Sequence, residues 1–320
     1  SSAASDVYKR QLIGNIFQQF YNMADTIIVG RTISVEALAA VGATGSISFL
    51  IVGFVQGVTS GFAVITAQRF GAGSENGVRR SVATSIILGI AVTIVMTAIS
   101  VLAARPLLEI MKTPSDIIDD SYNYIIVIFE GIAAAVFFNL FSSILRSLGD
   151  SKTPLVFLII ASIINIILDF VFILTFKMGV AGAGWATVIA QFISGILCFV
   201  YSLKKFPILR LTKHDWKFSW KFAWQHLEVG LPMAFQFSIT AIGTMVIQSA
   251  LNSLGSTAVA AFTAGSKIDQ FATQPLASLG VAVATYTAQN YGARKLERIK
   301  KGVTGAAIIA CLLYTSPSPR

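Results

Sequence analysis

Two aspartates stand inside long apolar stretches, where a charged side chain is costly. Asp25 follows the first apolar run of the chain, in the segment YNMADTI, and Asp169 lies in the middle of IINIILDFVF. A charge at the centre of a bilayer costs about 2.5–3.5 kcal/mol on insertion scales, so such an acid suggests a functional role. A carboxyl group in apolar surroundings can hold a proton near neutral pH and release it when water or another cation arrives. The two residues therefore predict reversible binding of a proton or a metal cation.

Polar residues accompany both aspartates at helical spacing. Tyr21 lies four residues before Asp25, and Asn165 lies four residues before Asp169, so each pair shares one face of a helix. The alternative interpretation is a carboxylate whose hydrogen bonds are satisfied where two helices pack together. The residues alone leave both interpretations open.

The composition places these residues in membrane-spanning helices. Of 320 residues, 55% are hydrophobic and 12% are charged, and the mean hydropathy is +0.74. Soluble domains carry about 25% charged residues, so a soluble fold and a disordered chain are both excluded. A span needs about 20 apolar residues, and a proline inside a span is expected to kink it, as Pro275 would. We predict an all-α polytopic fold with spans over residues 12–32, 43–68, 81–104, 121–145, 154–176, 182–203, 228–253, 259–289 and 299–310.

Both ends of the chain have the character of translated sequencing adapter. The segment DVYKRQ can be encoded by GATGTGTATAAGAGACAG, and the reverse complement of that DNA, read one base in, encodes CLLYTS at residues 311–316. We therefore expect residues 1–11 and 311–320 to be adapter-derived and the native gene to continue on both sides. Cys198 is then the only native cysteine, which excludes a disulfide framework and a cysteine-based metal cluster.

The basic residues predict an orientation in the membrane. Sixteen Lys and Arg residues lie in the loops after the second, fourth, sixth and eighth spans, and four lie in the alternate loops. Cytoplasmic loops carry an excess of Lys and Arg, so we expect the N-terminus in the cytoplasm. The net charge of +9 at pH 7 is explained in this way without a nucleic-acid partner.

The sequence also repeats itself without gaps. TAQRFGA at residues 66–72 recurs as TAQNYGA at residues 287–293, an offset of 221 residues that carries the first span onto the seventh. Each repeat thus has six spans, and both copies share one orientation, which is a transporter architecture with the substrate path between the halves. We predict an N-terminal bundle over residues 12–205, a cytoplasmic linker over 206–224 and a partial second bundle over 225–310.

The motifs resemble those of the multidrug and toxic compound extrusion (MATE) family. QQFYNMADTIIVGR followed by EALAAVG resembles the first span of that family, and TAQRFGAG, ILRSLGDSKTP, NIILDFVFI and GVAGAGWATVIAQ resemble later spans. The resemblance implies two six-helix bundles with the second one truncated here. It also implies an antiporter of the cell membrane that exports amphipathic, often cationic, compounds in exchange for protons or Na⁺. We expect a monomer with no other cofactor.

The resemblance also implies roles for particular residues. Asp25 and Asp169 fall on acidic positions of the family's N-terminal bundle, and polar positions around them match Tyr21, Tyr124, Asn139, Asn165 and Thr187. Hard cations require oxygen ligands. A sodium site is therefore implied at Asp25, Asn165, Asp169 and Thr187.

The chain departs from the family pattern at two places. The seventh span, GLPMAFQFSITAIGTMVIQ, holds no acid, which leaves coupling to the N-terminal bundle. Phe170 stands where members often have a proline after the aspartate.

Other polar residues have two interpretations each. Glu130 either joins a proton relay or bonds to a neighbouring helix. Lys267 and Asp269 lie on different helix faces and could serve the C-terminal cavity or contact other helices. Gly71 and Gly292, which close the repeated motif, are expected to be helix caps.

Several classes of protein lack support in the sequence. There is no HExxH, no GxxxxGK[ST], no CxxC and no TVGYG, so an intramembrane metalloprotease, an ATP-driven pump and a potassium channel are unsupported, and no enzyme is predicted. Two alternatives stay open. One is a flippase for a lipid-linked precursor, which should have a basic cavity. The other is a non-transporting receptor or scaffold, which should need no buried acids.

Overall fold

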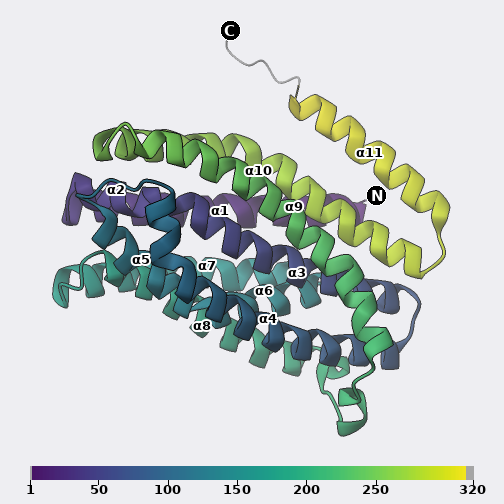
Figure 1. Ribbon diagram of the computed structural model, residues 1–320. Coiled ribbons are helices and arrows are strands. Elements are labelled where there is room, and N and C mark those ends of the chain that lie inside the picture. Colours follow the sequence, from purple (N-terminus) through teal and green to yellow (C-terminus); the bar gives the residue numbers. More distant parts are fainter. Residues whose placement is uncertain (1, 315–320) are drawn as a thin grey trace.

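Every regular element is a helix in the part of the chain that the structure describes. The computed structural model (Figure 1) describes residues 2–314, without the side chains of residues 2–4, 7, 18, 19, 21–23 and 314. In chain order the elements are α1 (Ser2–Thr32), α2 (Val35–Ala43), α3 (Gly45–Gly71), α4 (Glu75–Ile110), α5 (Ile118–Glu130), α6 (Ile132–Ser147), α7 (Lys152–Phe170), the π-helix η1 (Val171–Thr175), α8 (Val180–Lys205), the 3₁₀ helices η2 (Pro207–Leu209) and η3 (Lys213–Trp216), α9 (Trp220–Asn252), α10 (Ser256–Gly292) and α11 (Leu296–Tyr314).

Each of the nine predicted spans coincides with a helix or with consecutive helices, and the all-α polytopic fold is confirmed. Five helices are long and apolar enough to cross a membrane by length and composition, or six when α5 and α6 count as one span. The span predicted over residues 121–145 is divided between α5 and α6, which meet at a bend of 49°. Gly131 occupies the bend, where an added Cβ would lie 2.3 Å from a methyl group of Val188. By contrast, α10 continues through Pro275 as one helix.

The internal repeat is visible in the boundaries of the elements. The first residues of α2 and α10, the last residues of α3 and α10, and the first residues of α4 and α11 each differ by 221. After the repeated motif the chain turns in the same way in both copies, with a left-handed residue at Gly73 (φ 75°) and at Arg294 (φ 57°). The two TAQ motifs are therefore equivalent in structure as well as in sequence.

The helices of the two repeats pack along two seams that share one register. On the first seam, α1 and α10 are joined by the pairs Asn15–Ser278 and Phe20–Phe271. On the second seam, backbones of α3 and α9 meet where Gly57 faces Ala234 and Gly61 faces Gly230. In each of these four pairs the two residue numbers add up to between 291 and 293. The two helices of each seam are therefore antiparallel. The first seam is made by side chains and the second by backbone contact.

The two TAQ motifs meet each other at the ends of α3 and α10. An added Cβ at Gly71 would lie 2.1 Å from the Gln289 carbonyl oxygen, and one at Gly292 would lie 2.0 Å from the Gln68 carbonyl oxygen. The prediction that these glycines are helix caps is wrong, because the C-cap residues are Ala72 and Ala293. The glycines are needed because each helix end approaches the backbone of the other.

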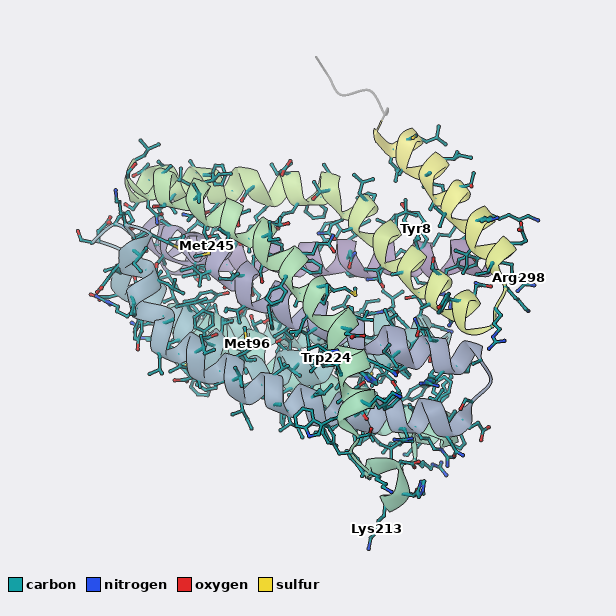
Figure 2. The ribbon with its side chains drawn as sticks, turned by 45° about the vertical axis from the view of Figure 1, so that its right-hand side comes forward. Tyr8, Met96, Lys213, Trp224, Met245 and Arg298 are labelled. Atoms are coloured by element: carbon teal, nitrogen blue, oxygen red, sulfur yellow. The ribbon has the colours of Figure 1, made fainter. Side chains whose placement is uncertain are left out.

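Lys and Arg gather at one end of the helices, in the connecting segments and on the helix ends beside them, and we call this the basic end. It comprises loop 72–74, loop 148–151, linker 206–219 and turn 293–295, and it carries Lys213 of the linker and Arg298 of α11 (Figures 1 and 2). Lys205 bonds to Asp150 at 3.0 Å. Burial alone would raise the pKa of Asp150, but hydrogen bonds from Thr153 and Lys205 outweigh burial and hold it below its usual range.

A buried hydrogen-bond chain joins the two halves near the basic end. Thr66 of α3 lies 2.7 Å from Ser81 of α4, whose hydroxyl lies 2.8 Å from His226 Nε2 of α9. His226 Nδ1 lies 2.9 Å from the carbonyl oxygen of Phe222. A carbonyl can only accept, so Nδ1 carries the proton and Nε2 accepts from Ser81. The imidazole is therefore held in one tautomer.

Candidate functional site

The structure brings Asp25 and Asn165 together from different helices. The Asn165 amide of α7 donates to a carboxylate oxygen of Asp25 on α1 at 3.0 Å. Asp169 lies one turn further along α7 with no exposed surface. Among the described buried side chains, both Asp169 oxygens and the Asn165 amide oxygen have no hydrogen-bond partner. The alternative of a carboxylate satisfied by helix packing therefore does not describe Asp169.

The local fold of α7 explains how Asp169 is held. The helix stays regular through Phe170, and the π-helix η1 then begins at Val171, where the Phe176 amide donates to the Val171 carbonyl at 3.1 Å. The sequence has Phe170 where a proline often follows the aspartate, and here a π-turn supplies the irregularity. Single π-turns inside α-helices occur frequently at functional sites.

Thr187 and Tyr124 lie on neighbouring elements of the same site. The Thr187 hydroxyl of α8 donates to the Ala183 carbonyl at 3.1 Å, and it also approaches the Asp25 carboxylate. Tyr124 packs against the buried group formed by α1, η1 and α8, which includes Ile28 and Ile173. Of the predicted sodium ligands, Asn165 bonds to Asp25, Thr187 approaches Asp25 from α8, and Asp169 lies one turn beyond Asn165 on α7.

The remaining predicted residues lie elsewhere or are not described. Glu130 is exposed at the bend between α5 and α6, and in the described part no hydrogen bond or ion pair joins it to Asp25. Asn139 donates to the Ala135 carbonyl of its own helix at 2.8 Å and lines a separate pocket. The side chain of Tyr21 lies outside the described residues.

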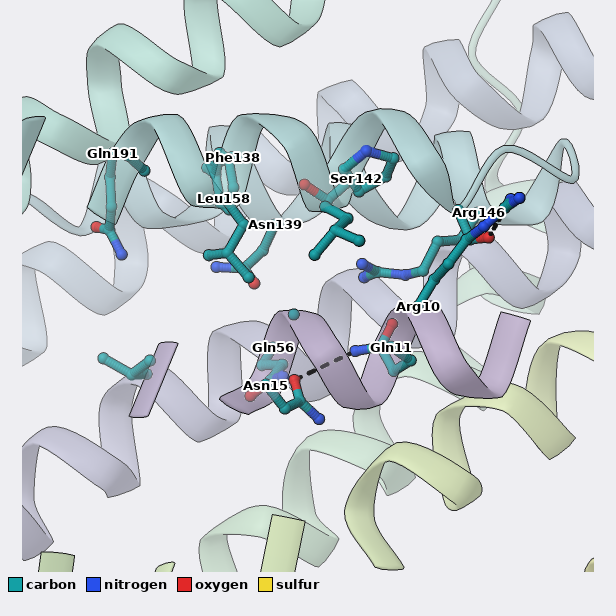
Figure 3. A pocket seen from close by; sticks show the side chains of 16 residues that line it. Arg10, Gln11, Asn15, Gln56, Phe138, Asn139, Ser142, Arg146, Leu158 and Gln191 are labelled. Carbon is teal, nitrogen blue, oxygen red and sulfur yellow. Dashed lines mark hydrogen bonds between the residues drawn. The ribbon is translucent and has the colours of Figure 1, made fainter. Parts of the chain in front are cut away.

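This separate pocket lies inside the N-terminal bundle and has a polar wall (Figure 3). Arg146 donates to Ser143 at 3.1 Å, and no ion pair joins it to an acid among the described side chains. Ser142 is buried there without a partner. Residues lining the pocket include Asn15, Gln56, Asn139, Ser142, Arg146, Gln191 and also Arg10, which falls in the segment predicted to be adapter-derived. Gln56 and Gln191 are polar residues inside predicted spans, and such residues are the sequence signal that could have indicated this pocket.

Lys267 of α10 is a half-buried charged residue of the second bundle, whereas Asp269 on the same helix is exposed. No ion pair within 4.0 Å joins Lys267 to Asp25 in the described structure. The described residues also hold no group of three or more His, Cys, Asp or Glu side chains suited to a metal ion.

Comparisons with known proteins agree on one family. The MatE family profile matches residues 12–171 and 232–316. The chain is 29% identical over 297 residues to the probable multidrug resistance protein YoeA of Bacillus subtilis, covering 91% of this chain and 64% of that protein. It is 30% identical over 292 residues to the probable multidrug resistance protein YpnP of the same organism, covering 90% and 64%. The chain thus spans less than two thirds of the length of these relatives.

Solved structures of similar fold include two states of one family. An outward-facing MATE family multidrug resistance transporter superposes with a TM-score of 0.86 at 27% identity, covering 97% of this chain and 69% of that one. The inward-facing form gives 0.78, covering 92% and 68%. A superfamily transporter from Pyrococcus furiosus, described as having a binding pocket of reversed polarity, gives 0.87 at 27% identity, covering 97% and 69%. The chain is therefore a multi-pass membrane protein that belongs to the MatE family, as its motifs indicate.

Proposed function

We propose that the protein is a secondary antiporter that exports amphipathic, often cationic, compounds in exchange for protons or Na⁺ bound in the N-terminal bundle. The observation that carries the proposal is the set of three unpartnered buried oxygens on Asn165 and Asp169, next to the bond between Asn165 and Asp25. A buried charge without a partner costs several kcal/mol, so a cation at Asp169 would be favoured, and the Asn165 amide oxygen is free to help hold it.

Two cations fit this arrangement by different chemistry. A proton on Asp169 would remove its charge, and the resulting O–H group could donate to a neighbouring oxygen. A sodium ion would be held by carboxylate, amide and hydroxyl oxygens, which are the ligands that hard cations prefer. Asn165 suits the second role, because its amide nitrogen already donates to Asp25 and its oxygen is left over.

The state of the helices supports alternating access. The two TAQ motifs are in contact at the basic end, and the fold superposes better on the outward-facing relative than on the inward-facing one. The Lys and Arg distribution predicts that the basic end faces the cytoplasm, and in that orientation this state would be closed on the cytoplasmic side of the cell membrane. Cation binding to the N-terminal bundle would then favour release of the substrate outward, and the two repeats would rock to reset.

Efflux from vesicles with an imposed gradient tests the proposal. The full gene product is reconstituted with a fluorescent cationic dye, and a proton or Na⁺ gradient is imposed. Asp25→Asn and Asp169→Asn should each reduce gradient-driven efflux to that of protein-free vesicles. Asp269→Asn makes the same chemical change at an exposed position of α10 and should leave efflux unchanged. Undiminished gradient-driven efflux by both site variants would remove the proposed coupling site, whereas a full gene product that gives no gradient-driven efflux would favour a receptor or scaffold.

A second substrate class has one observation in its favour. Arg146 opens into a pocket with amide and hydroxyl groups, and no ion pair joins it to an acid in the described structure. A guanidinium in such a wall suits a carboxylate or phosphate group, which is also what a flippase for a lipid-linked precursor would require. Arg146→Gln separates the two classes, since it should impair export of an anionic dye and spare that of a cationic dye.

A further inference from the structure

The two halves of the chain also meet at the end of the helices opposite to the basic end, which we call the far end (Figure 1). There α2 lies against the first turns of α10, and an added Cβ at Gly42 would lie only 2.7 Å from the Cβ of Thr263. The two residues are 221 positions apart, so they are equivalent in the two repeats. The contact therefore joins equivalent points of the two repeats, as the contact between the TAQ motifs does at the basic end.

Small apolar side chains fill the contact between α2 and α10. The buried group there includes Ala39, Ala40 and Ala43 of α2 together with Val259 and Ala260 of α10. Each of these side chains is at most 5% exposed. Small residues let two helices approach closely, so the two halves are packed against each other at the far end.

A polar contact fastens the turn between α9 and α10 to the loop after α4. Asn252, the last residue of α9, donates to the Met111 carbonyl at 2.9 Å and accepts from the Gln248 amide at 2.9 Å. Ser256, the first residue of α10, donates to the Asp116 carboxylate at 2.6 Å. Asn252 is buried, so loss of its side chain would leave the Met111 carbonyl and the Gln248 amide without these partners.

One helix connects the far end to the basic end. α10 runs from Ser256 in the far contact to Gly292 beside the TAQ contact. At a rise of 1.5 Å per residue, a helix of 37 residues is about 55 Å long. If such a rod tilts about its middle, it moves away from the other half at one end and toward it at the opposite end.

We propose that the contact between α2 and α10 is the outer gate of the transport path, and that Asn252, through its bond to Met111, is the latch that holds this gate shut. The inference rests on the proposed function, because a gate requires a substrate that passes between the halves. The halves touch at the TAQ motifs as well, so the structure represents an occluded state. Release outward then requires the turn between α9 and α10 to leave the loop after α4.

Distances between spin labels test the latch. The full gene product is placed in lipid nanodiscs with labels at Val35 on α2 and Leu254 in the turn after α9, both of which are exposed. Asn252→Leu loses both bonds, so the population at longer distance should rise about tenfold relative to the closed one. Ser256→Ala loses one bond and should raise it about threefold. Ser253→Ala makes the same chemical change at a hydroxyl that donates within its own helix, and it should leave the distances unchanged.

A second pair of variants tests the gate without touching the latch. Gly42→Ala should also favour the longer distance, because its Cβ would collide with Thr263, whereas the added Cβ of Gly45→Ala would meet no atom within 4 Å. Unchanged distances in Asn252→Leu would overturn the latch, and unchanged distances in Gly42→Ala would overturn the gate.

A parallel measurement separates these results from the proposed function. Gradient-driven efflux of the cationic dye is measured with the wild-type protein, and its absence would overturn the proposed function and with it the role of the contact as a gate. Efflux by the wild type together with unchanged distances in the variants would overturn the inference alone. Helical circular dichroism and a single elution peak establish that each variant is folded.

Discussion

The contact between the two TAQ motifs can be tested by adding one methyl group. In Gly292→Ala the new Cβ would lie 2.0 Å from the Gln68 carbonyl oxygen, far inside contact distance. Both atoms belong to helix backbones, so the helix ends must separate by about 1 Å or more, and overpacking of this kind costs about 1–3 kcal/mol. Each 1.4 kcal/mol changes an equilibrium about tenfold, so the state closed at the basic end should lose at least several-fold in population.

Spin labels at Phe70 and Tyr291 would report the separation. These residues are equivalent in the two repeats, are exposed, and precede the two glycines. Distance measurements on the full gene product should show a longer distance gaining weight in Gly292→Ala. Gly280→Ala is the matched control on the same helix, because its added Cβ would meet no atom within 4 Å. An unchanged distance distribution in Gly292→Ala would refute the argument that this glycine closes the basic end.

Three further predictions concern other contacts. Gly61→Leu should destabilise the chain by about 2 kcal/mol or more, since even a Cβ there would lie 2.3 Å from Gly230, and thermal unfolding in detergent measures it. Ser81→Ala should cost about 1–3 kcal/mol in the same assay, because it leaves His226 Nε2 buried without its donor, whereas Ser253→Ala on the surface should cost little. Asp150→Asn should lower stability at pH 7 by about 1–2 kcal/mol. Because the pKa of Asp150 is held below its ordinary value in the fold, its contribution is fully present above that ordinary value and is lost as the pH falls through the lowered one, so the deficit should shrink progressively in acid.

The fold was largely predictable because membrane spans and repeats leave strong signals. Apolar length located the nine spans that contain α1 and α3 to α11, with α5 and α6 in one span and the short helix α2 not predicted, and the offset of 221 residues reappears in the element boundaries. The break at Gly131 was missed, since it depends on Val188 of α8, which is distant in sequence. Gly53, Gly57 and Gly61 recur every four residues and could have indicated close helix packing.

For the candidate site, the sequence indicated which residues to consider but not which of them are in contact. Apolar flanks singled out Asp25 and Asp169, and helical spacing attached Asn165 to the same face as Asp169. The bond from Asn165 to Asp25 depends on the packing of α1 against α7, which one sequence does not specify.

The two seams differ in the kind of contact that joins their helices, and this difference bears on how the bundles could move. Along α3 and α9, glycine and alanine let the backbones touch, so any separation would lose close packing over several turns at once. Along α1 and α10, the contacts include a hydrogen bond and an aromatic pair, each of which can be broken singly. A rocking motion would therefore pivot on α3 and α9 and open between α1 and α10. In the proposed function, a cation bound at Asp25 of α1 would act next to this weaker seam.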